Sequence, residues 1–522
     1  MSEHHQEAVV PETAGMRQWL GLGVLALATL LLALDFSVLH LALPHVVADL
    51  QPSSTQQLWI LDIYGFMLAG FLVTMGTLGD RIGRKRLLMI GAALFGLCSI
   101  AAAYSVSAEM LIITRALLGM AGATLMPSTL SLIGNMFRKP KQRGIAIAVW
   151  LSCFSAGGAI GPLIGGLMLQ WFWWGSVFLL GVPVMLVLLL TAPFLLPEFR
   201  SPQAGKLDLP SVVISLVAVL SVIYALKEIA SYGIQPFPIA MLILGIGSGY
   251  IFIRRQQLVQ EPLLNLTFFR NRTFNGALIG LLISVFALGG FVLFFAQYLQ
   301  LVEGLTPLKA GLWMIPYALA NIVGAMMTPS LANRMSASKL IALGLALASF
   351  GFLFYNIAVW LSLPGLAVMV SGSILIMLGL SPLMVLSTDR VVASVPPEQT
   401  GSASSLSEMS SEMGMALGIA ILGTVGTATY RRLIAGAIPE NTPAEMAEAV
   451  GDSLAGAVAA TESFTDPSYP YLMEAAREAF SAGIQVVGVV SAVLLIGLII
   501  LNQTVFRTKS DESQDNEADA RG

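Results

Sequence analysis

The feature that most constrains this 522-residue sequence is a series of fourteen apolar runs, each near the roughly 20 residues that cross a bilayer as a helix. Charged residues make up only 11% of the chain, against about 25% in a soluble globular domain, so the chain cannot cover a water-facing surface. We therefore expect an all-α membrane protein with fourteen transmembrane helices. Their expected spans are 18–43, 55–78, 87–106, 109–134, 144–170, 173–196, 209–229, 236–255, 274–301, 309–332, 338–360, 363–387, 400–429 and 481–505.

The distribution of basic residues supports this count and predicts the orientation. An even number of helices places both termini on one side, and the cytoplasmic side of a membrane protein carries the excess of lysine and arginine. With cytoplasmic termini, most basic residues fall in inner connections, and few fall outside: Lys227, Lys309, Arg431, Arg432 and Arg477. The polar, acidic start of the chain does not resemble a signal peptide. We expect a multi-pass protein of the bacterial inner membrane.

Composition and motifs exclude several classes of function. A net charge of −3 does not suggest a nucleic-acid partner, and Cys98 and Cys153 lie in apolar runs that indicate neither a disulfide framework nor a metal site. The sequence lacks the glycine-rich loop G-x-x-x-x-G-K-[ST] that binds nucleotide phosphates, and no nucleophile motif suggests an enzyme. We therefore expect a transporter that uses an ion gradient, with no cofactor and no metal.

An internal repeat divides the chain into two halves. Residues 142–161 align without gaps to 399–418, and residues 76–88 align to 329–341 at a nearly equal offset. Transporters built from such repeats place the substrate site near the midplane, between the halves. The repeat leaves the seventh and eighth helices without a counterpart. The expected units are a cytoplasmic segment 1–17, a six-helix half 18–196, a linker with two inserted helices 197–273, a second six-helix half 274–505 with an outer loop 431–480, and a disordered tail 506–522.

Several motifs resemble those of the major facilitator superfamily. The sequence GTLGDRIGRKRLL at 76–88 is similar to the superfamily's signature loop, RALLGMAG around Arg115 to its basic fourth-helix motif, and GGAIGPLIGG at 157–166 to its antiporter motif. LALDFSVLHLALP in the first helix and WILDIYGF in the second resemble the 14-helix drug:proton antiporter branch, the QacA/SmvA-type pumps. Some members of that branch carry an acid in the tenth helix, where this sequence has none.

The resemblance implies a fold, a function and a set of residues. It implies two six-helix halves plus two inserted helices, and a monomeric antiporter that exchanges protons for lipophilic cations such as quaternary ammonium compounds, cationic dyes and biguanides. A different cargo on the same fold, such as an amino acid, a peptide or a siderophore, is the alternative. The implied conformational motif contains Gly76, Gly79, Asp80, Arg81, Gly83 and Arg84, and the implied antiporter motif contains Gly157, Gly158, Gly161, Pro162, Gly165 and Gly166. Setting topology and ordinary helix packing are the alternative roles of these two motifs.

Intramembrane charges are the main candidates for the site. Asp35 lies in the middle of the first helix, where a carboxylate costs about 2.5–3.5 kcal/mol on insertion scales, so it is a proton site, a cation anchor or a hydrogen-bonded structural acid. Asp62 lies nearer the interface and serves in binding or gating, or is simply solvated. Arg115 needs a partner or an aqueous cavity in the membrane. The family resemblance implies a role in proton coupling for Arg115, and a structural ion pair is the alternative.

Two further acids share one face of the thirteenth helix. Glu408 and Glu412 are one helical turn apart in a serine- and methionine-rich stretch, so they repel each other if both are ionised, and we expect at least one to hold a proton. Aromatic side chains stabilise a cation that lies over the ring face. The expected cavity aromatics are Tyr64, Trp150, Phe154 and Phe295, with packing or lipid contact as the alternative for each.

Overall fold

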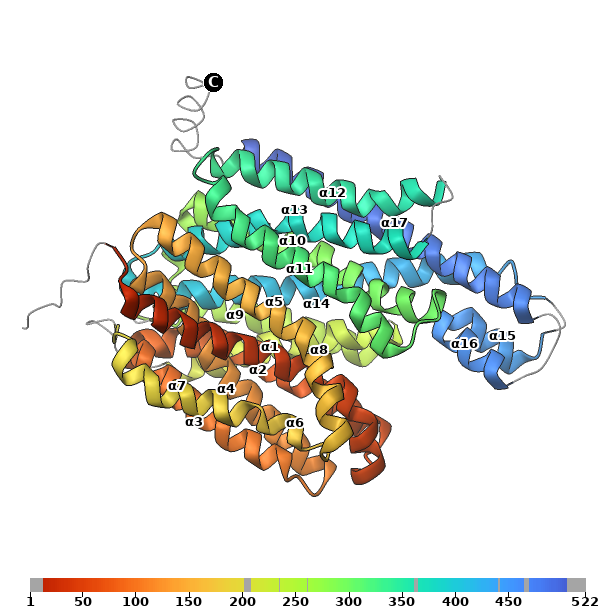
Figure 1. Cartoon of the computed structure of the whole chain (residues 1–522), viewed down its shortest axis with the longest axis horizontal. Coiled ribbons are helices and arrows are strands. Elements are labelled where there is room, and N and C mark those ends of the chain that lie inside the picture. Colours follow the sequence, from red (N-terminus) through yellow and green to blue (C-terminus); the bar gives the residue numbers. More distant parts are fainter. Residues whose placement is uncertain are drawn as a thin grey trace, which may run out of the picture.

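The computed structural model describes residues 13–200, 208–233, 235–260, 262–360, 365–439, 442–463 and 469–504. Within these residues, 14 helices are long and apolar enough to cross a membrane, which confirms the expected number. The expected tail 506–522 and most of the expected segment 1–17 lie outside the described residues. Figure 1 shows the long helices running side by side, with the N-terminal half in red to yellow and the C-terminal half in green to blue.

The N-terminal half contains six membrane-crossing segments. Its helices are α1 (Met16–Leu50), α2 (Ser54–Ile82), α3 (Arg84–Ala103), α4 (Ala108–Met136), α5 (Pro140–Trp171), α6 (Ser176–Leu179) and α7 (Gly181–Leu195). The sixth span is interrupted between α6 and α7, whereas the sequence predicted one continuous helix. Pro183 explains the interruption, because proline lacks the N–H that would bond to the carbonyl four residues earlier.

Two inserted helices follow, α8 (Leu209–Tyr232) and α9 (Pro236–Leu258). They pack against each other, and α8 also packs against α2 and α14, the helices that meet where the two halves touch. Asp208, just before α8, receives hydrogen bonds from Arg255 of α9 at 2.8 and 2.9 Å and from Ser211 at 2.6 Å. These bonds lower the pKa of Asp208 to about 2, so its carboxylate stays charged and fixes this end of the helix pair.

Within the described residues, the C-terminal half contains six more membrane-crossing segments, the short helices α15 and α16, and three single-turn segments, η1 to η3. Its elements are η1 (Leu266–Arg270), α10 (Arg272–Gln297), η2 (Tyr298–Val302), α11 (Pro307–Leu331), α12 (Ala337–Trp360), α13 (Gly365–Ala393), η3 (Pro397–Gln399), α14 (Thr400–Ile434), α15 (Ala444–Asp452), α16 (Leu454–Ser463) and α17 (Tyr469–Thr504). Helices α15 and α16 lie beyond the end of the bundle in Figure 1, within the segment 431–480 that the sequence predicted as an outer loop.

Several predicted boundaries are wrong in the same direction. Helix α1 continues to Leu50 rather than residue 43, α14 to Ile434 rather than 429, and α17 begins at Tyr469 rather than 481. The extra turns carry polar or charged residues such as Glu474 and Arg477, which a search for apolar runs passes over although the helix continues through them. Because α14 ends later and α17 begins earlier than predicted, the segment between them is shorter than the expected loop 431–480.

The internal repeat corresponds to a repeated helix contact. Gly157 of α5 lies against the backbone of Leu30 in α1, and the aligned Gly414 of α14 lies against the backbone of Leu282 in α10. A Cβ at Gly414 would come within 2.5 Å of the Leu282 carbonyl oxygen. Glycine permits this close approach of two membrane helices. The α1–α5 pair of one half therefore corresponds to the α10–α14 pair of the other.

Neighbouring glycines of α5 provide a matched test of this packing. We expect Gly157→Ala to lower the stability of the folded protein by about 1–3 kcal/mol, because its methyl group would collide with the Leu30 carbonyl. We expect Gly158→Ala to leave stability unchanged or slightly raised, because a Cβ there meets nothing within 4 Å. The melting temperatures of the two purified variants measure the difference, and equal melting temperatures would contradict the assigned contact.

Candidate functional site

The intramembrane acid of α1 and the intramembrane base of α4 are partners. Nη1 of Arg115 lies 2.6 Å from Oδ2 of Asp35. The Arg115 side chain is completely buried and that of Asp35 is 8% exposed. A buried charge is stable only when it is paired and hydrogen-bonded, so each residue makes the other tolerable inside the N-terminal half. The sequence predicted both residues as candidates but did not pair them.

Tyr64 of α2 connects this ion pair to the other half. The guanidinium carbon of Arg115 lies 4.6 Å from the centroid of the Tyr64 ring, a cation–π contact. Tyr64 is 2% exposed, and its hydroxyl has no hydrogen-bond partner in the part of the chain that the structure describes. Its hydroxyl is close enough to interact electrostatically with Asp35, Arg115 and Glu412. Tyr64 therefore lies where charges from both halves meet.

Glu408 and Glu412 lie on α14, a helix that packs against α2 and α4 of the N-terminal half. Both side chains are partly buried, and their charges interact with each other. Among the described residues, neither carboxylate has a hydrogen-bond partner, in contrast to Asp35. Two coupled carboxylates without partners in a weakly polar setting have the properties of a site that takes up a proton or a cation.

Asp62 of α2 pairs with a residue that the sequence analysis treated only as a topology signal. Its Oδ1 forms an ion pair with Nζ of Lys227, in the C-terminal part of the inserted helix α8. The side chains of Asp62 and Lys227 are 35% and 40% exposed. Asp62 therefore has a cationic partner in this structure, and its expected role in binding or gating stays a prediction.

The signature loop joins the two halves at one end of the bundle, here named the Asp80 end. Asp80 accepts hydrogen bonds from the backbone N–H of Ser402 at 2.9 Å and of Gly401 at 3.3 Å, and from the Ser402 hydroxyl at 2.7 Å. It therefore caps the first turn of α14, where a carboxylate is favoured by the unpaired N–H groups and the helix dipole. Arg84 forms an ion pair with Asp80 and donates a hydrogen bond to the Gly76 carbonyl at 3.1 Å.

Glycines of this loop permit its geometry. Gly83 alone separates α2 from α3 and has φ of 110°, a value that residues with a side chain rarely adopt. A Cβ at Gly76 would lie 2.6 Å from the Gly401 carbonyl oxygen, so α2 and α14 touch backbone to backbone. A Cβ at Gly79 would lie 3.1 Å from Nη1 of Arg84. Arg81 is partly buried on the last turn of α2.

Two acids near the Asp80 end were missed by the sequence analysis. Glu198 accepts hydrogen bonds from the backbone N–H groups of Lys85 and Arg86, at 3.0 and 3.1 Å, and so caps α3. Asp389 of α13 forms an ion pair with Arg143 of α5 at 2.6 Å, across the two halves. No sequence motif marks these acids, since their partners come from distant segments.

Further hydroxyl and amide contacts hold the same end closed. The hydroxyls of Ser131 and Thr400 are 2.5 Å apart, and Asn135 donates to Thr400 at 3.1 Å, joining α4 to α14. The hydroxyl of Thr77 donates to the Leu263 carbonyl at 2.7 Å, which ties the segment after α9 to α2. The structure is therefore a state in which the halves are joined at the Asp80 end.

Gly157, Gly161 and Gly165 of the antiporter motif lie on the face of α5 that packs against α1. Gly161 approaches Ser37, and a Cβ at Gly165 would lie 3.0 Å from Val38. A Cβ at Gly158 would meet nothing within 4 Å, and Gly166 is partly buried. The Pro162 side chain lies outside the described residues. The motif thus provides the α1–α5 contact beside Asp35.

The four expected cavity aromatics do not form one cavity. Tyr64 is part of the charge cluster, but Trp150 is 2% exposed and its indole donates to the Thr129 hydroxyl at 3.1 Å inside the N-terminal half. Phe295 is completely buried in the C-terminal half and stacks on Phe291 with ring centroids 5.1 Å apart. Phe154 is 39% exposed.

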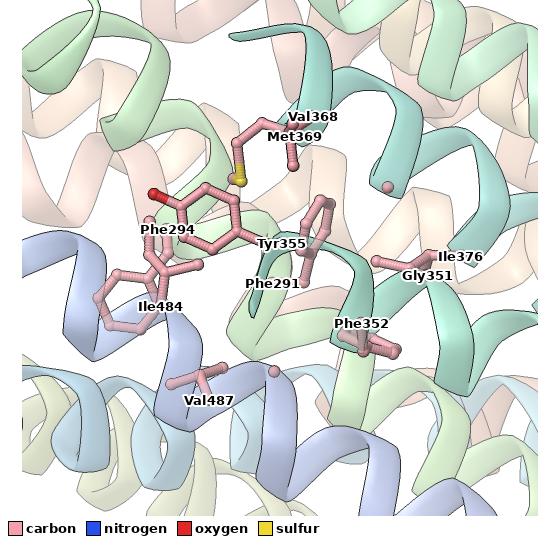
Figure 2. Close-up of a pocket in the computed structure, with 12 residues that line it drawn as sticks. Phe291, Phe294, Gly351, Phe352, Tyr355, Val368, Met369, Ile376, Ile484 and Val487 are labelled. Carbon is pink, nitrogen blue, oxygen red and sulfur yellow. The ribbon is translucent and has the colours of Figure 1, made fainter. Parts of the chain in front are cut away.

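A pocket within the C-terminal half is lined by none of the candidate acids Asp35, Asp62, Glu408 and Glu412. Figure 2 shows its aromatic and aliphatic lining, which includes Phe291, Phe294, Phe352, Tyr355 and Ile484. Its volume is about 20 Å³, enough for about one water molecule and too small for a drug-sized ligand. The acids, rather than this pocket, are the candidate site.

Comparison with known proteins gives the family. Residues 25–419 match the Major Facilitator Superfamily. The multidrug efflux pump LfrA of Mycolicibacterium smegmatis is 40% identical over 496 residues, 94% of this chain and 97% of that protein. The methyl viologen resistance protein SmvA of Salmonella typhimurium is 35% identical over 478 residues, 89% and 93% of the two chains.

Solved structures show the same fold. The human organic anion transporter MFSD10 has a TM-score of 0.59 at 15% sequence identity, covering 94% of this chain and all of that one. A bacterial homologue of the lysosomal transporter Spinster has a TM-score of 0.56 at 18% identity, covering 95% and 98%. Together with the 14 membrane-crossing helices and the motifs at 76–88 and 157–166, these matches confirm the resemblance. The chain belongs to the Major Facilitator Superfamily and is a multi-pass membrane transporter, not an enzyme.

Proposed function

We propose that this transporter is a proton-coupled antiporter that exports lipophilic cations, such as quaternary ammonium compounds, cationic dyes and biguanides, across the bacterial inner membrane. The observation that carries the proposal is the pair Glu408 and Glu412, two coupled carboxylates without hydrogen-bond partners among the described residues. Glu412 interacts electrostatically with Tyr64, whose ring contacts the Arg115 of the Asp35–Arg115 pair. The names of two relatives, a multidrug efflux pump and a methyl viologen resistance protein, support drug export.

The charges suggest how protons and cargo exchange. A carboxylate in a weakly polar site binds either a proton or a cation, because both remove the cost of an isolated negative charge. Protonation of Glu408 or Glu412 on the outer side releases the cargo, and the neutral site returns to the inner side. Protonation of Asp35 weakens its bond to Arg115, which frees the guanidinium to rearrange against Tyr64. The antiporter works as a monomer and uses the proton gradient without a cofactor.

The orientation follows from the basic loops. With both termini cytoplasmic, the Asp80 end is the inner end, so the state described here is closed toward the cytoplasm. Opening toward the cytoplasm requires Asp80 to leave the first turn of α14 and Arg143 to leave Asp389. The loop motif then controls the alternation of access and does not contact the cargo.

The energy source is the first test. We expect ethidium efflux from cells expressing the transporter to stop when an uncoupler collapses the proton gradient, and to continue when ATP is depleted with the gradient maintained. The absence of a phosphate-binding loop is the reason. Efflux is followed by ethidium fluorescence, with cells lacking the transporter as the control. ATP-driven transport into gradient-free vesicles would rule the proposal out.

Asp35 is the second test. We expect Asp35→Asn to reduce export of ethidium and benzalkonium to the level of cells without the pump, because the amide cannot carry a proton. The change leaves Arg115 without its charged partner, so the amount and monodispersity of the protein are measured in parallel. Asp35→Glu keeps the charge and should retain part of the export. Normal resistance with Asp35→Asn would show that Asp35 is structural.

The pair on α14 is the third test. We expect Glu408→Gln and Glu412→Gln to differ: the variant of the acid that mainly binds cargo loses some substrates more than others, and the variant of the acid that mainly couples protons loses all substrates together. Resistance profiles against monovalent dyes and divalent biguanides, with proton release on substrate binding, separate the two. Wild-type profiles and unchanged proton release in both variants would assign the pair a structural role.

A further inference from the structure

The inserted helix α8 places the side chain of Lys227 against Asp62 of the N-terminal half. Lys227 forms an ion pair with Asp62 of α2, and its ammonium nitrogen lies 4.9 Å from the centroid of the Phe66 ring, one helical turn along α2. A carboxylate and an aromatic ring face are the two groups that stabilise an organic cation in a protein site. The lysine ammonium therefore already occupies a small cation site.

Other aromatic rings extend this site. The rings of Trp59 on α2 and Tyr224 on α8 stack with centroids 6.5 Å apart, and Trp59 also contacts Phe66 edge to face at 6.0 Å. Phe237 of α9 contacts Tyr224 at 6.0 Å. The aromatic surface is larger than a lysine side chain requires, and it suits a bulky cation with a lipophilic body.

The site also lies where the two halves meet. The Lys227 ammonium pairs with Asp62 of the N-terminal half, and its charge is also close enough to Glu412 of α14 to interact with it electrostatically. Helix α8 also packs against both halves through an apolar cluster, which includes Phe66 of α2, Val219 and Ile223 of α8, and Met409 of α14. The inserted helix is thereby in contact with both halves at the level of the candidate site.

The Lys227–Asp62 pair differs from a structural ion pair. The Arg115 and Asp35 side chains are 0% and 8% exposed, whereas those of Lys227 and Asp62 are 40% and 35% exposed. An ion pair this exposed contributes less to stability than a buried pair whose partners cannot be left alone, so less free energy is needed to separate it. A charge held this weakly over an aromatic face can be replaced by another cation.

We propose that Lys227 is a built-in competitor of the cargo: its ammonium occupies the Asp62–Phe66 site when the transporter is empty, and the positive charge of an organic cation displaces it. The proposal rests on the proposed function, since it concerns how a cationic cargo enters that site. It assigns the inserted helix a role in selectivity, because only a cation with enough aromatic or lipophilic surface compensates for the lost lysine contact.

Equilibrium binding of tetraphenylphosphonium to the full-length protein in lipid nanodiscs tests this. We expect Lys227→Gln to bind the probe about five- to tenfold more tightly than the wild type, since the competing ammonium is gone. Lys227→Arg keeps the charge and should bind no more tightly than the wild type. Lys309→Gln removes an equal charge from an exposed position on α11 and should change nothing. In an Asp62→Asn background, Lys227→Gln should no longer increase affinity.

The outcomes separate this inference from the proposed function. If the wild type binds tetraphenylphosphonium but Lys227→Gln binds it equally or less tightly, or if the gain persists in the Asp62→Asn background, the competitor role is overturned while cation export stands. If no variant binds or exports the probe, both proposals fail. Lys227→Met replaces Lys227→Gln if the latter is not monodisperse. In the wild type, saturating tetraphenylphosphonium should increase acylation of the Lys227 amine, measured by mass spectrometry, because a displaced amine is no longer paired with Asp62. Unchanged acylation would also contradict displacement.

Discussion

The pairing of Asp35 with Arg115 is the interaction on which the N-terminal half depends. A completely buried guanidinium needs a partner inside a membrane protein, and here Asp35 lies 2.6 Å away. That requirement fixes α1 against α4, and the glycines of α5 permit α1 to approach closely enough to bring Asp35 into place. Because Arg115 also lies over the Tyr64 ring, and Tyr64 interacts electrostatically with Glu412 of α14, a change in the charge of Asp35 alters the electrostatic environment of Glu412.

A second charge arrangement links the halves at the Asp80 end. Asp80 caps α14, the same helix that carries Glu408 and Glu412 two to three turns further along. A movement of α14 that breaks the cap therefore moves the two glutamates as well, since a helix transmits displacement along its axis. The Arg143–Asp389 pair acts on a different helix pair, α5 and α13, so the closed end is held at two separate places.

The sequence allowed the architecture to be predicted more fully than the site. Apolar runs and basic loops depend on local composition, so the number of helices and the two-half arrangement could be predicted from the sequence. The aligned Gly157 and Gly414 make corresponding helix contacts in the structure. Helix ends were underestimated where charged turns continue α1, α14 and α17. Pairings such as Asp62 with Lys227, or Asp389 with Arg143, join residues more than a hundred positions apart and depend on how helices pack, which no local pattern records.

The formal charges of the site are compatible with the proposed export of divalent cations, although the tenth membrane-crossing helix, α11, carries no acid. Asp35, Asp62, Glu408 and Glu412 contribute four negative charges when ionised, and Arg115 and Lys227 contribute two positive charges, which leaves two negative charges uncompensated. Two protons or one dication neutralise that remainder. If Lys227 leaves Asp62, Asp62 becomes a third available acid beside Glu408 and Glu412. The inserted helix then adjusts the charge of the site without adding an acid to it, which gives these two helices a reason to be present in a fold whose repeat does without them.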